Sequence, residues 1–568
     1  MATPPGVCES AFSGARLPVV FERAASDNFL SSSTRLRALV HDDRSSSGVL
    51  LARGSQVAAA VTLIAIALLS GCNVGPRYTA PAAPAAPAFK ESSPAAYRAA
   101  PPGTWQPAEP QDAVLKGKWW EMFNEPELNA LEDQLDINNQ NIAQYFQNFM
   151  AARAQVSEAR SAYFPTVTAN PTLTKGGTGG SSTAAAVSPA SGTTTGTGAT
   201  QTSVSTGYTT IALPIDVSWE PDLWGRVRNT VREFQYATQV SAADLENERL
   251  TEQADLAEYY FQLRGQDALQ DVYNRMIAED RQSLDLTRAL FETGIDNQVA
   301  VDEAQVTLDN AEEAATGIAT NRAIYEHAIA MLIGQPASSF SMPVKNLTTP
   351  LPAIPVGVPS ELLERRPDIA AAERTMAEAN ALIGVEKAAY YPTLSLTGSG
   401  GLQSSAISKL FSLPALFWSL GASASETIFD AGLRKATMAQ YTAQYNADVA
   451  AYKQTVLTAF QQVEDYIATL RVTSEQIERQ QQAISSSERY VTHETSRYET
   501  GLDPYLLVNA AQLTLLSNQQ IQVTLRVNEM TAAVELVQAL GGGWNVTELP
   551  AASRIRSKET PRQVEETP

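Results

Sequence analysis

Cysteine and histidine are scarce in this sequence. Among its 568 residues there are two cysteines and three histidines. Two cysteines do not build a disulfide framework, and three scattered histidines do not build a multi-histidine zinc site. The scarcity therefore argues against a disulfide-stabilised scaffold and against a zinc enzyme.

Positive charge is also in short supply. Lysine and arginine number 41 against 61 aspartates and glutamates, so the formal net charge is −20. Nucleic-acid binding needs a basic face that neutralises phosphates, so no nucleic-acid partner is expected. The sequence also lacks a phosphate-binding loop, a dinucleotide fingerprint and a nucleophile elbow. We therefore predict a protein that is not an enzyme and that holds no metal and no cofactor.

Long hydrophobic runs are missing after residue 72, where no apolar stretch reaches the roughly 18–20 residues that a membrane helix requires. A shorter uncharged run, Val57–Leu69, leads into Ser70, Gly71 and Cys72. An apolar run of this size before small residues and a cysteine is typical of a bacterial lipoprotein signal. Cys72 is therefore the predicted lipidation site, and its lipid is the one covalent group expected. The alternative is a chance cysteine after a buried apolar run.

The predicted leader comprises residues 1–71. A lipoprotein leader does not normally lie fifty residues inside a gene product, so we interpret residues 1–50 as a start assigned too early. No methionine lies between Met1 and Cys72. The true start would then be a non-methionine codon near Val49 or Leu50.

The remainder of the chain contains a duplication. The segment 162–166 (AYFPT) recurs as 389–393 (AYYPT), and Glu-Thr-Gly at 292–294 recurs at 499–501 with an offset of 207 residues. A duplicated unit predicts a repeated architecture. The predicted parts are a lipid-anchor and collar segment (72–121), a first repeat (122–335), a collar linker (336–365), a second repeat (366–542) and a C-terminal collar and tail (543–568).

Each repeat is predicted to contain a helix, a strand, a loop, a strand, a long helix, a turn and a final helix. The stretches 226–293 and 433–500 contain no proline, which predicts two helices of about 100 Å. Gly294 and Gly501 predict the turns that end them, since glycine adopts left-handed backbone at little cost. Apolar residues three and four apart predict a coiled-coil seam along the second long helix: Val456, Phe460, Val463, Ile467, Leu470 and Ile477.

Between the short and long helices the hydrophobic period changes to two. Apolar residues alternate with small or polar ones over 211–219, 393–397 and 418–425, and 176–207 is rich in glycine, serine, threonine and alanine. The alternation is typical of transmembrane barrel strands with a wet lumen, and a half-buried sandwich is the alternative. The composition of 176–207 predicts a mobile surface loop.

Four strands per chain cannot close a barrel. Open strand edges in hydrocarbon would leave backbone groups unsatisfied at a cost of several kcal/mol each. We therefore expect several copies of the chain to share one barrel. Composition leaves two, three or four copies open.

Three motifs connect the chain to a known family. They are Gly75-Pro76-Arg77-Tyr78, Trp119-Trp120 followed by Phe123 and Pro126-Glu127-Leu128-Asn129, and the run from Pro359 to Ile369. With these motifs the chain resembles the TolC-like outer-membrane efflux proteins, and most closely the NodT-type outer-membrane lipoproteins of resistance-nodulation-division (RND) pumps. The resemblance covers Cys72 to about Trp544.

The resemblance implies an α+β membrane channel. It implies a homotrimeric twelve-stranded transmembrane β-barrel, four strands per chain, continuous with a long periplasmic α-helical coiled-coil barrel and a mixed equatorial collar. The location implied is the bacterial outer membrane, with a lipid anchor and with the helical tunnel in the periplasm.

The implied function is that of a passive duct in a tripartite efflux pump. The partners would be a periplasmic adaptor protein and an inner-membrane RND transporter, and small molecules or ions would leave the periplasm through the trimer. Two alternatives remain open at this point. One is a periplasmic coiled-coil lipoprotein that acts as a scaffold without conducting, and the other is a type I protein-secretion duct of the same fold.

The resemblance also suggests site residues. The helix tips are expected to contact the adaptor, with an ordinary solvated helix end as the alternative for each residue: Glu292, Thr293, Gly294, Asp296, Tyr498, Thr500, Gly501 and Asp503. Family members often carry an aspartate nine residues after the second turn glycine, but Ala510 stands there in this chain, beside Asn509. We predict that Asp302 or Glu303 forms the carboxylate ring of the periplasmic aperture and that Asn509 adds a weaker latch. An outward-facing, solvated pair is the alternative for Asp302 and Glu303.

Overall fold

The computed structural model describes residues 73–83, 89–91, 117–178, 206–354, 362–552 and 554–555. All of them belong to one compact unit, Ile66–Pro568. Cys72 and the predicted leader lie outside the described residues. Among the described helices, none combines the length and the apolar character that crossing a membrane requires.

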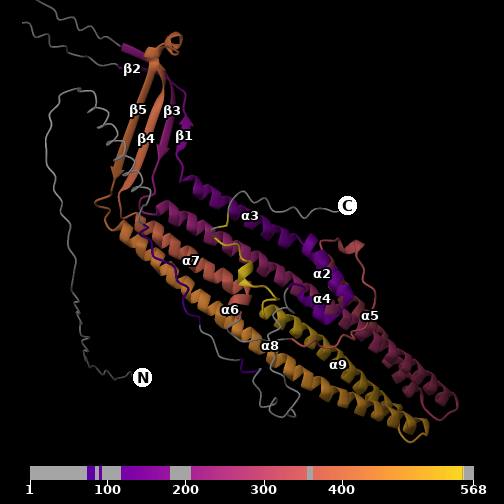
Figure 1. Cartoon of the computed structure of the whole chain (residues 1–568). Coiled ribbons are helices and arrows are strands. Elements are labelled where there is room, and N and C mark those ends of the chain that lie inside the picture. The colour runs from indigo at the N-terminus through magenta and orange to yellow at the C-terminus, as the bar shows by residue number, and fades with distance from the viewer. Residues whose placement is uncertain are drawn as a thin grey trace, which may run out of the picture. The chain divides into compact units, whose positions relative to one another are not determined.

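Two helical hairpins form most of the described chain. The first pairs α4 (Arg226–Glu292) with α5 (Gln298–Leu332), and the second pairs α8 (Leu433–Glu499) with α9 (Tyr505–Ala539) (Figure 1). Helices α4 and α8 have 67 residues each, so each is about 100 Å long. The bounds of the second hairpin follow those of the first by 207 residues, which confirms the predicted duplication and both long helices.

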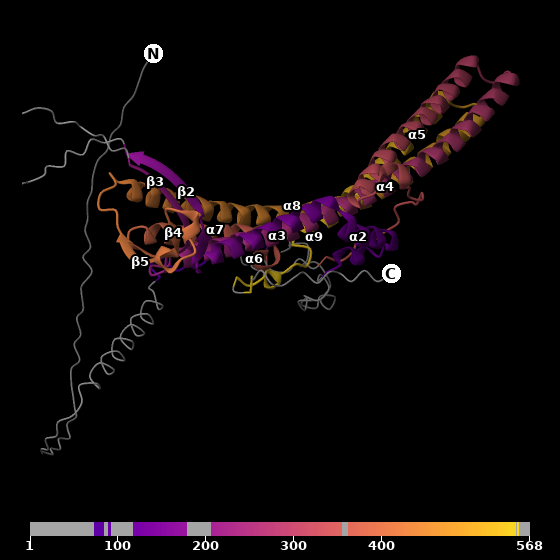
Figure 2. The same ribbon diagram turned by 90° about the horizontal axis from the view of Figure 1, so that it is seen from above.

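Shorter helices pack against the long ones. Helix α3 (Gln140–Ser161) contacts α4, and α7 (Pro367–Ala388) contacts both α4 and α8 (Figure 2). The side chain of Asn139 caps α3, whereas α7 begins with a proline, which has no N–H to leave unpaired in the first turn. A proline and then a strand follow each of these helices, as the sequence predicts.

The other helical elements are short. They are α2 (Pro126–Asn138), α6 (Leu362–Arg365) and the 3₁₀ helices η2 (Trp119–Phe123), η3 (Ala337–Ser339), η5 (Ile407–Lys409), η6 (Leu413–Ala415) and η7 (Val546–Glu548).

The strands form one antiparallel sheet. Its order is β1 (Thr166–Ala169), β3 (Thr206–Trp219), β4 (Thr393–Ser404) and β5 (Leu416–Ser425), and β2 (Thr172–Thr178) also pairs with β3. Five strands thus occupy the four predicted positions. The first position is divided because the intervening segment contains a proline, which has no N–H for the ladder.

The glycine-rich and serine-rich segment predicted to be a loop enters the sheet at both ends. Residues 176–178 of β2 pair with 206–208 of β3. The predicted loop was therefore too long. Its ends pair because ladder hydrogen bonds use backbone groups, which every residue here supplies whatever its side chain. Residues 179–205 lie outside the described residues.

Strand register places the apolar residues on one face of the sheet. Ile215 of β3 pairs with Gly400 of β4, and Gly400 pairs with Trp418 of β5, so these positions share a face. The apolar side chains on this face are largely exposed, at 55% for Ile215 and 74% for Trp418. The opposite face carries mainly small polar residues: Thr166, Thr168, Asp216, Ser218, Ser395, Thr397, Ser399, Ser419 and Ser423. The predicted alternation is confirmed, and nothing in the described chain covers the apolar side.

The largest core cluster joins the predicted collar segment to the helices. Trp119, Trp120 and Phe123 are buried among side chains of α2, α4, α5 and α9. The indole nitrogen of Trp119 donates to Gln253 Oε1 of α4 at 3.3 Å. Buried aromatic side chains contribute most to such cores because each removes a large area from water. The tryptophan pair therefore anchors η2 to the helices, and the collar itself remains a prediction.

A buried ion network ties the 342–345 segment to the same helices. Asp267 of α4 accepts hydrogen bonds from Arg322 Nε of α5 at 2.7 Å, from Arg264 Nη1 at 3.1 Å and from the backbone N–H of Lys345 at 3.0 Å. The side chains of Asp267 and Arg264 are 1% and 2% exposed. The partners of Asp267 thus come from α4, from α5 and from the 342–345 segment.

The Arg366 side chain clamps the end of α9. Its Nη1 donates to the carbonyl oxygen of Ala539, the last residue of α9, at 3.0 Å and to Gln462 Oε1 of α8 at 2.9 Å. Its other nitrogens pair with Asp368. A cation at a helix C-terminus satisfies unpaired carbonyls and favours the helix dipole. This gives Arg366, a residue of the third sequence motif, a structural role.

Candidate functional site

The two hairpin tips have the same backbone geometry. At the first tip, the Gly294 N–H donates to the Phe291 carbonyl and the Ile295 N–H donates to the Leu290 carbonyl, both at 2.9 Å. Gly501 and Leu502 make the equivalent bonds at the second tip. This is the Schellman pattern, which needs a left-handed residue, and the φ angles of Gly294 and Gly501 are 78° and 73°. The turns predicted at both glycines are confirmed.

A tyrosine connects the two tips. The hydroxyl of Tyr498 in α8 donates to Asp296 Oδ2 in the α4–α5 turn at 2.8 Å. Tyr498 is 4% exposed, and its ring makes an edge contact with Tyr505 of α9, with centroids 5.5 Å apart. Burial, opposed by a hydrogen bond with Thr287 and reinforced by Asp296, raises the pKa of Tyr498 to about 12. The phenol therefore stays protonated and remains a donor at neutral pH.

The other predicted tip residues are distributed differently. Arg497 forms an ion pair with Asp503 within the second tip. Four predicted tip residues are exposed, three at the first tip and one at the second: Glu292, Thr293, Gly294 and Gly501. Thr500 is exposed as well, and its hydroxyl donates to the Ser496 carbonyl at 3.0 Å, as the Thr293 hydroxyl donates to the Ala289 carbonyl at 3.1 Å. The structure thus places Tyr498, Asp296 and Asp503 in contacts of the hairpins themselves and leaves the others facing solvent.

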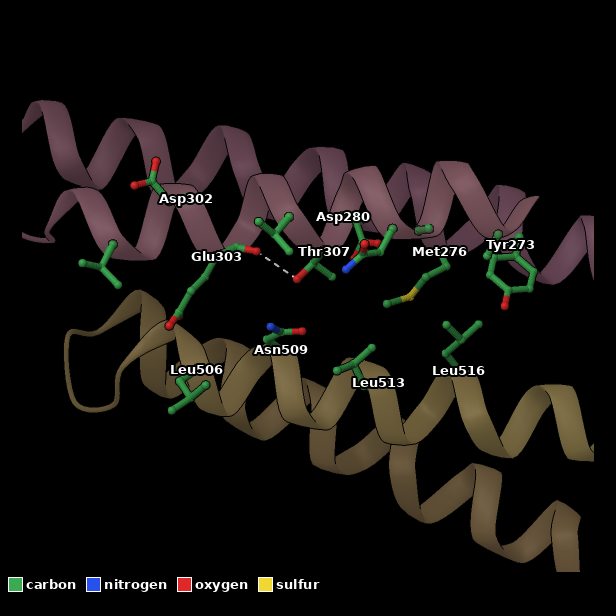
Figure 3. Close-up of a pocket in the computed structure, with 15 residues that line it drawn as sticks. Tyr273, Met276, Asp280, Asp302, Glu303, Thr307, Leu506, Asn509, Leu513 and Leu516 are labelled. Carbon is green, nitrogen blue, oxygen red and sulfur yellow. Dashed lines mark hydrogen bonds between the residues drawn. The ribbon is translucent and has the colours of Figure 1, made fainter. Parts of the chain in front are cut away.

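The predicted aperture residues lie around one cavity. Asp302 and Glu303 of α5 and Asn509 of α9 all line a space of about 530 Å³ between the α4–α5 hairpin and α9 (Figure 3). Asp302 is exposed and accepts a hydrogen bond from Gln298 Nε2 at 2.9 Å, and Glu303 is half-buried. The structure brings the three residues together. Their role in an aperture remains a prediction.

Sequence reasoning missed the most unusual residue at this cavity. Asp280 of α4 lines it and is fully buried, and neither carboxylate oxygen has a hydrogen-bond partner in the described part of the chain. Burial, followed by the nearby charge of Glu279, raises the pKa of Asp280 to about 7. One signal was available: with the offset of 207 residues, Asp280 corresponds to Ser487, so the carboxylate belongs to one repeat only.

Within the described residues, no three histidine, cysteine, aspartate or glutamate side chains lie close enough together to hold a metal ion. The features that remain are the joined hairpin tips, the cavity behind them and the sheet with its exposed apolar face. These features suit the passage or the binding of a ligand more than they suit catalysis. The hydrogen bond between the tips and the acidic residues at the cavity could regulate either one.

The fold of this chain matches that of solved outer-membrane channels. The solved outer-membrane channel OprN is 27% identical in sequence to this chain, with a TM-score of 0.72, and the match covers 83% of this chain and 100% of that one. The predicted fold class, an α+β channel of the TolC-like type, is confirmed.

Two curated relatives agree with this fold. The antibiotic efflux pump outer membrane protein ArpC of Pseudomonas putida is 29% identical over 499 residues, which is 87% of this chain and 97% of ArpC. Outer membrane protein OprJ of Pseudomonas aeruginosa is 31% identical over 506 residues, or 85% of this chain and 96% of OprJ. The model of the outer membrane efflux protein family matches residues 131–335 and 358–542. The chain therefore belongs to the outer membrane efflux protein family.

Proposed function

We propose that this protein is the outer-membrane duct of a tripartite RND-type efflux pump, a passive trimer that lets small molecules or ions pass from the periplasm to the exterior. Its family accounts for the outer-membrane location and for the role in efflux. The observation that carries the duct is the sheet, whose exposed face is apolar while the opposite face is small and polar. Such strands suit lipid on one side and water on the other. The duct itself performs no chemistry.

The open edges of the sheet support assembly from several copies. Among the described residues, β5 pairs only with β4, and β1 and β2 pair only with β3, so two edges are free. In hydrocarbon each unsatisfied backbone group would cost several kcal/mol, so the edges must pair with other copies. A trimer supplies twelve strand positions, and the same symmetry would join the paired helices into a periplasmic tunnel.

The proposal is tested on the purified mature protein in detergent. We expect a heat-modifiable trimer in electrophoresis and discrete ion conductance in a planar bilayer. A scaffolding lipoprotein would give neither band nor conductance. A monomer that stays soluble without detergent would refute the proposed duct.

A lipid on Cys72 is supported by where the chain goes next. The side-chain oxygen of Asn73, the adjacent residue, accepts a hydrogen bond from Asn229 Nδ2 at 3.0 Å in the first turn of α4. That turn begins soon after β3 ends at Trp219, so Asn73, the residue that follows Cys72, lies near the boundary between strands and helices. An acyl group placed there would reach the inner leaflet of a membrane that the strands cross.

Cys72→Ala is expected to abolish incorporation of labelled palmitate into the protein. The helical circular dichroism should stay unchanged, because the hydrogen bond of Asn73 does not involve the cysteine. The other cysteine, Cys8, belongs to the predicted leader, so Cys72 is the one cysteine expected in the mature protein and no label should remain elsewhere. A Cys72→Ala protein that is still labelled would contradict lipidation at this site.

The hairpin tips are the proposed contact with the periplasmic adaptor, and the Tyr498–Asp296 hydrogen bond is the proposed latch between them. The exposed residues at the turns are available to a partner: Glu292, Thr293, Gly294, Thr500 and Gly501. Tyr498 joins the two hairpins of one chain, so a partner that separates the tips must break this bond. The adaptor in turn would connect the duct to an RND transporter.

Asp302 and Glu303 are proposed to form the acidic ring of the periplasmic aperture, with Asn509 beside them. Replacing both carboxylates by alanine removes negative charge from the cavity, so the ratio of cation to anion permeability should fall. The check is the reversal potential of the reconstituted channel in a salt gradient. An exposed aspartate on the same helix, Asp309, provides the matched control variant. Unchanged selectivity and conductance in the double variant would exclude the ring.

A further inference from the structure

The cavity between the α4–α5 hairpin and α9 is large enough for a small organic molecule. Its volume of about 530 Å³ lies within the range of roughly 300–1,000 Å³ that small-molecule sites occupy. Much of its wall is apolar or aromatic, and Figure 3 shows these side chains on both sides of the space: Tyr273, Met276, Leu506, Leu513 and Leu516. An apolar body would therefore find a matching surface here.

At this cavity hydrogen-bond acceptors lack donors. Asp280 contributes two carboxylate oxygens and Asn509 contributes its amide oxygen, and none of the three has a hydrogen-bond partner among the described residues. The hydroxyl of Thr307, which also lines the cavity, donates to the backbone carbonyl of Glu303 at 3.0 Å. Buried polar groups are normally paired, and an unpaired buried carboxylate is especially costly. A donor that carries positive charge would pair these oxygens and compensate the ionised carboxylate of Asp280.

The residues that line the cavity favour an organic cation over a metal ion. A calcium or magnesium ion needs about six or more oxygen ligands, and the described residues contain no cluster of three acidic, histidine or cysteine side chains. A primary ammonium group carries three N–H donors and no acceptor, which matches the unpaired oxygens of Asp280 and Asn509. An attached alkyl or aryl group would contact the apolar wall, and the Tyr273 ring is suited to a cation.

We propose that this cavity is a binding site for amphiphilic primary amines, with the ammonium group held by Asp280 and Asn509 and the apolar part against Met276, Leu513 and Leu516. The negative charges of Asp302 and Glu303, which also line the cavity, attract the cation toward it. The site goes beyond the proposed duct, because a passive duct needs no binding pocket in its helical wall. Its test uses binding alone and so stays separate from any test of conduction.

The direct test is isothermal titration of the purified full-length mature protein in detergent with 2-phenylethylammonium chloride at pH 8. We expect saturable binding of one amine per chain. Asp280→Asn should weaken binding by about tenfold or more, since a hydrogen bond to a charged group contributes roughly 1.5–3 kcal/mol. Asp285→Asn is the matched control: Asp285 lies on the same helix with its side chain 80% exposed, and its removal should leave the affinity unchanged.

Two further ligands test separately what the positive charge and the N–H donors of the amine contribute to binding. The uncharged 2-phenylethanol has the same apolar group and should bind at least tenfold more weakly, because it leaves the carboxylate uncompensated. The quaternary phenethyltrimethylammonium ion keeps the charge but has no N–H, so it should also bind more weakly than the primary amine.

A second variant, which fills the cavity with a larger side chain, tests the site if Asp280→Asn does not fold. Leu513→Trp reduces the cavity without altering any charge and is expected to abolish amine binding while the helical circular dichroism is retained. Equal affinity of the wild type and either variant, no saturable heat with the wild type, or binding of magnesium chloride that displaces the amine would each overturn the proposal.

Discussion

Replacing Tyr498 by phenylalanine is expected to raise the ratio of open to closed reconstituted channels by about tenfold or more. The variant removes one hydroxyl and leaves the rest of the ring in its buried contact with Tyr505. A hydrogen bond to a charged group contributes roughly 1.5–3 kcal/mol, and a coupling of that size changes the ratio of two conformations by about tenfold or more. Single-channel recording measures the effect directly.

The direction follows from the contact. The Tyr498 hydroxyl joins α8 to Asp296 of the other hairpin, so the bond exists only while the tips are together. Since the pKa of the phenol is raised to about 12, chiefly by burial, the donor is retained throughout the neutral range. Loss of the bond thus favours separation of the tips at any ordinary working pH.

A matched control and a partner variant sharpen this test. Tyr490→Phe changes a tyrosine of the same helix that is 40% exposed, and it should leave the open probability unchanged. Asp296→Asn should reproduce part of the effect, and the double variant should add little to Tyr498→Phe, as expected when two residues share one interaction. An unaltered open probability in Tyr498→Phe would remove the latch from the proposed function.

Asp267→Ala is expected to lower the free energy of unfolding by about 3–5 kcal/mol, the usual loss when one partner of a buried ion pair is removed. The variant leaves Arg264, whose side chain is 2% exposed, without its buried carboxylate. It also removes an acceptor for Arg322 of α5 and for the Lys345 N–H. The measurement is the urea dependence of helical circular dichroism in detergent.

Asp271→Ala is the control for this variant. Asp271 lies one turn further along α4, with its side chain 45% exposed and paired with Arg275 at 3.2 Å. An exposed pair of this kind contributes about 0–1 kcal/mol, so the control should remain close to wild type. A loss in Asp267→Ala no larger than in Asp271→Ala would mean that the network does not hold the 342–345 segment.

The long helices and their turns were predictable because their causes are local. A stretch without proline allows continuous helix, and a glycine with positive φ ends it, so the ends at Glu292 and Glu499 follow from nearby residues. The duplication strengthened the prediction, since two copies carried the same signals. The strand alternation was predictable for the same reason, because successive side chains of a strand point to opposite faces of the sheet.

The site was less predictable because it combines distant parts of the chain. The sequence contains nothing that pairs Tyr498 with Asp296, and the tie depends on how the two hairpins pack. Within its own repeat, nothing in the sequence distinguishes Asp280 from the solvent-facing polar residues of the same long helix. Its burial at the cavity depends on α9, whose residues come more than two hundred positions later.

Taken alone, the sequence determined the repeat, the helices, the turn glycines and the two-faced strands, because backbone preference and hydrophobic period act over a few residues. Only the tertiary structure decided that the sheet keeps its apolar face exposed, that Asp267 and Tyr498 join separate helices, and that Asp280 lies buried without a partner. Those outcomes depend on packing between segments far apart in sequence, where burial and the choice of partner are set by the whole fold.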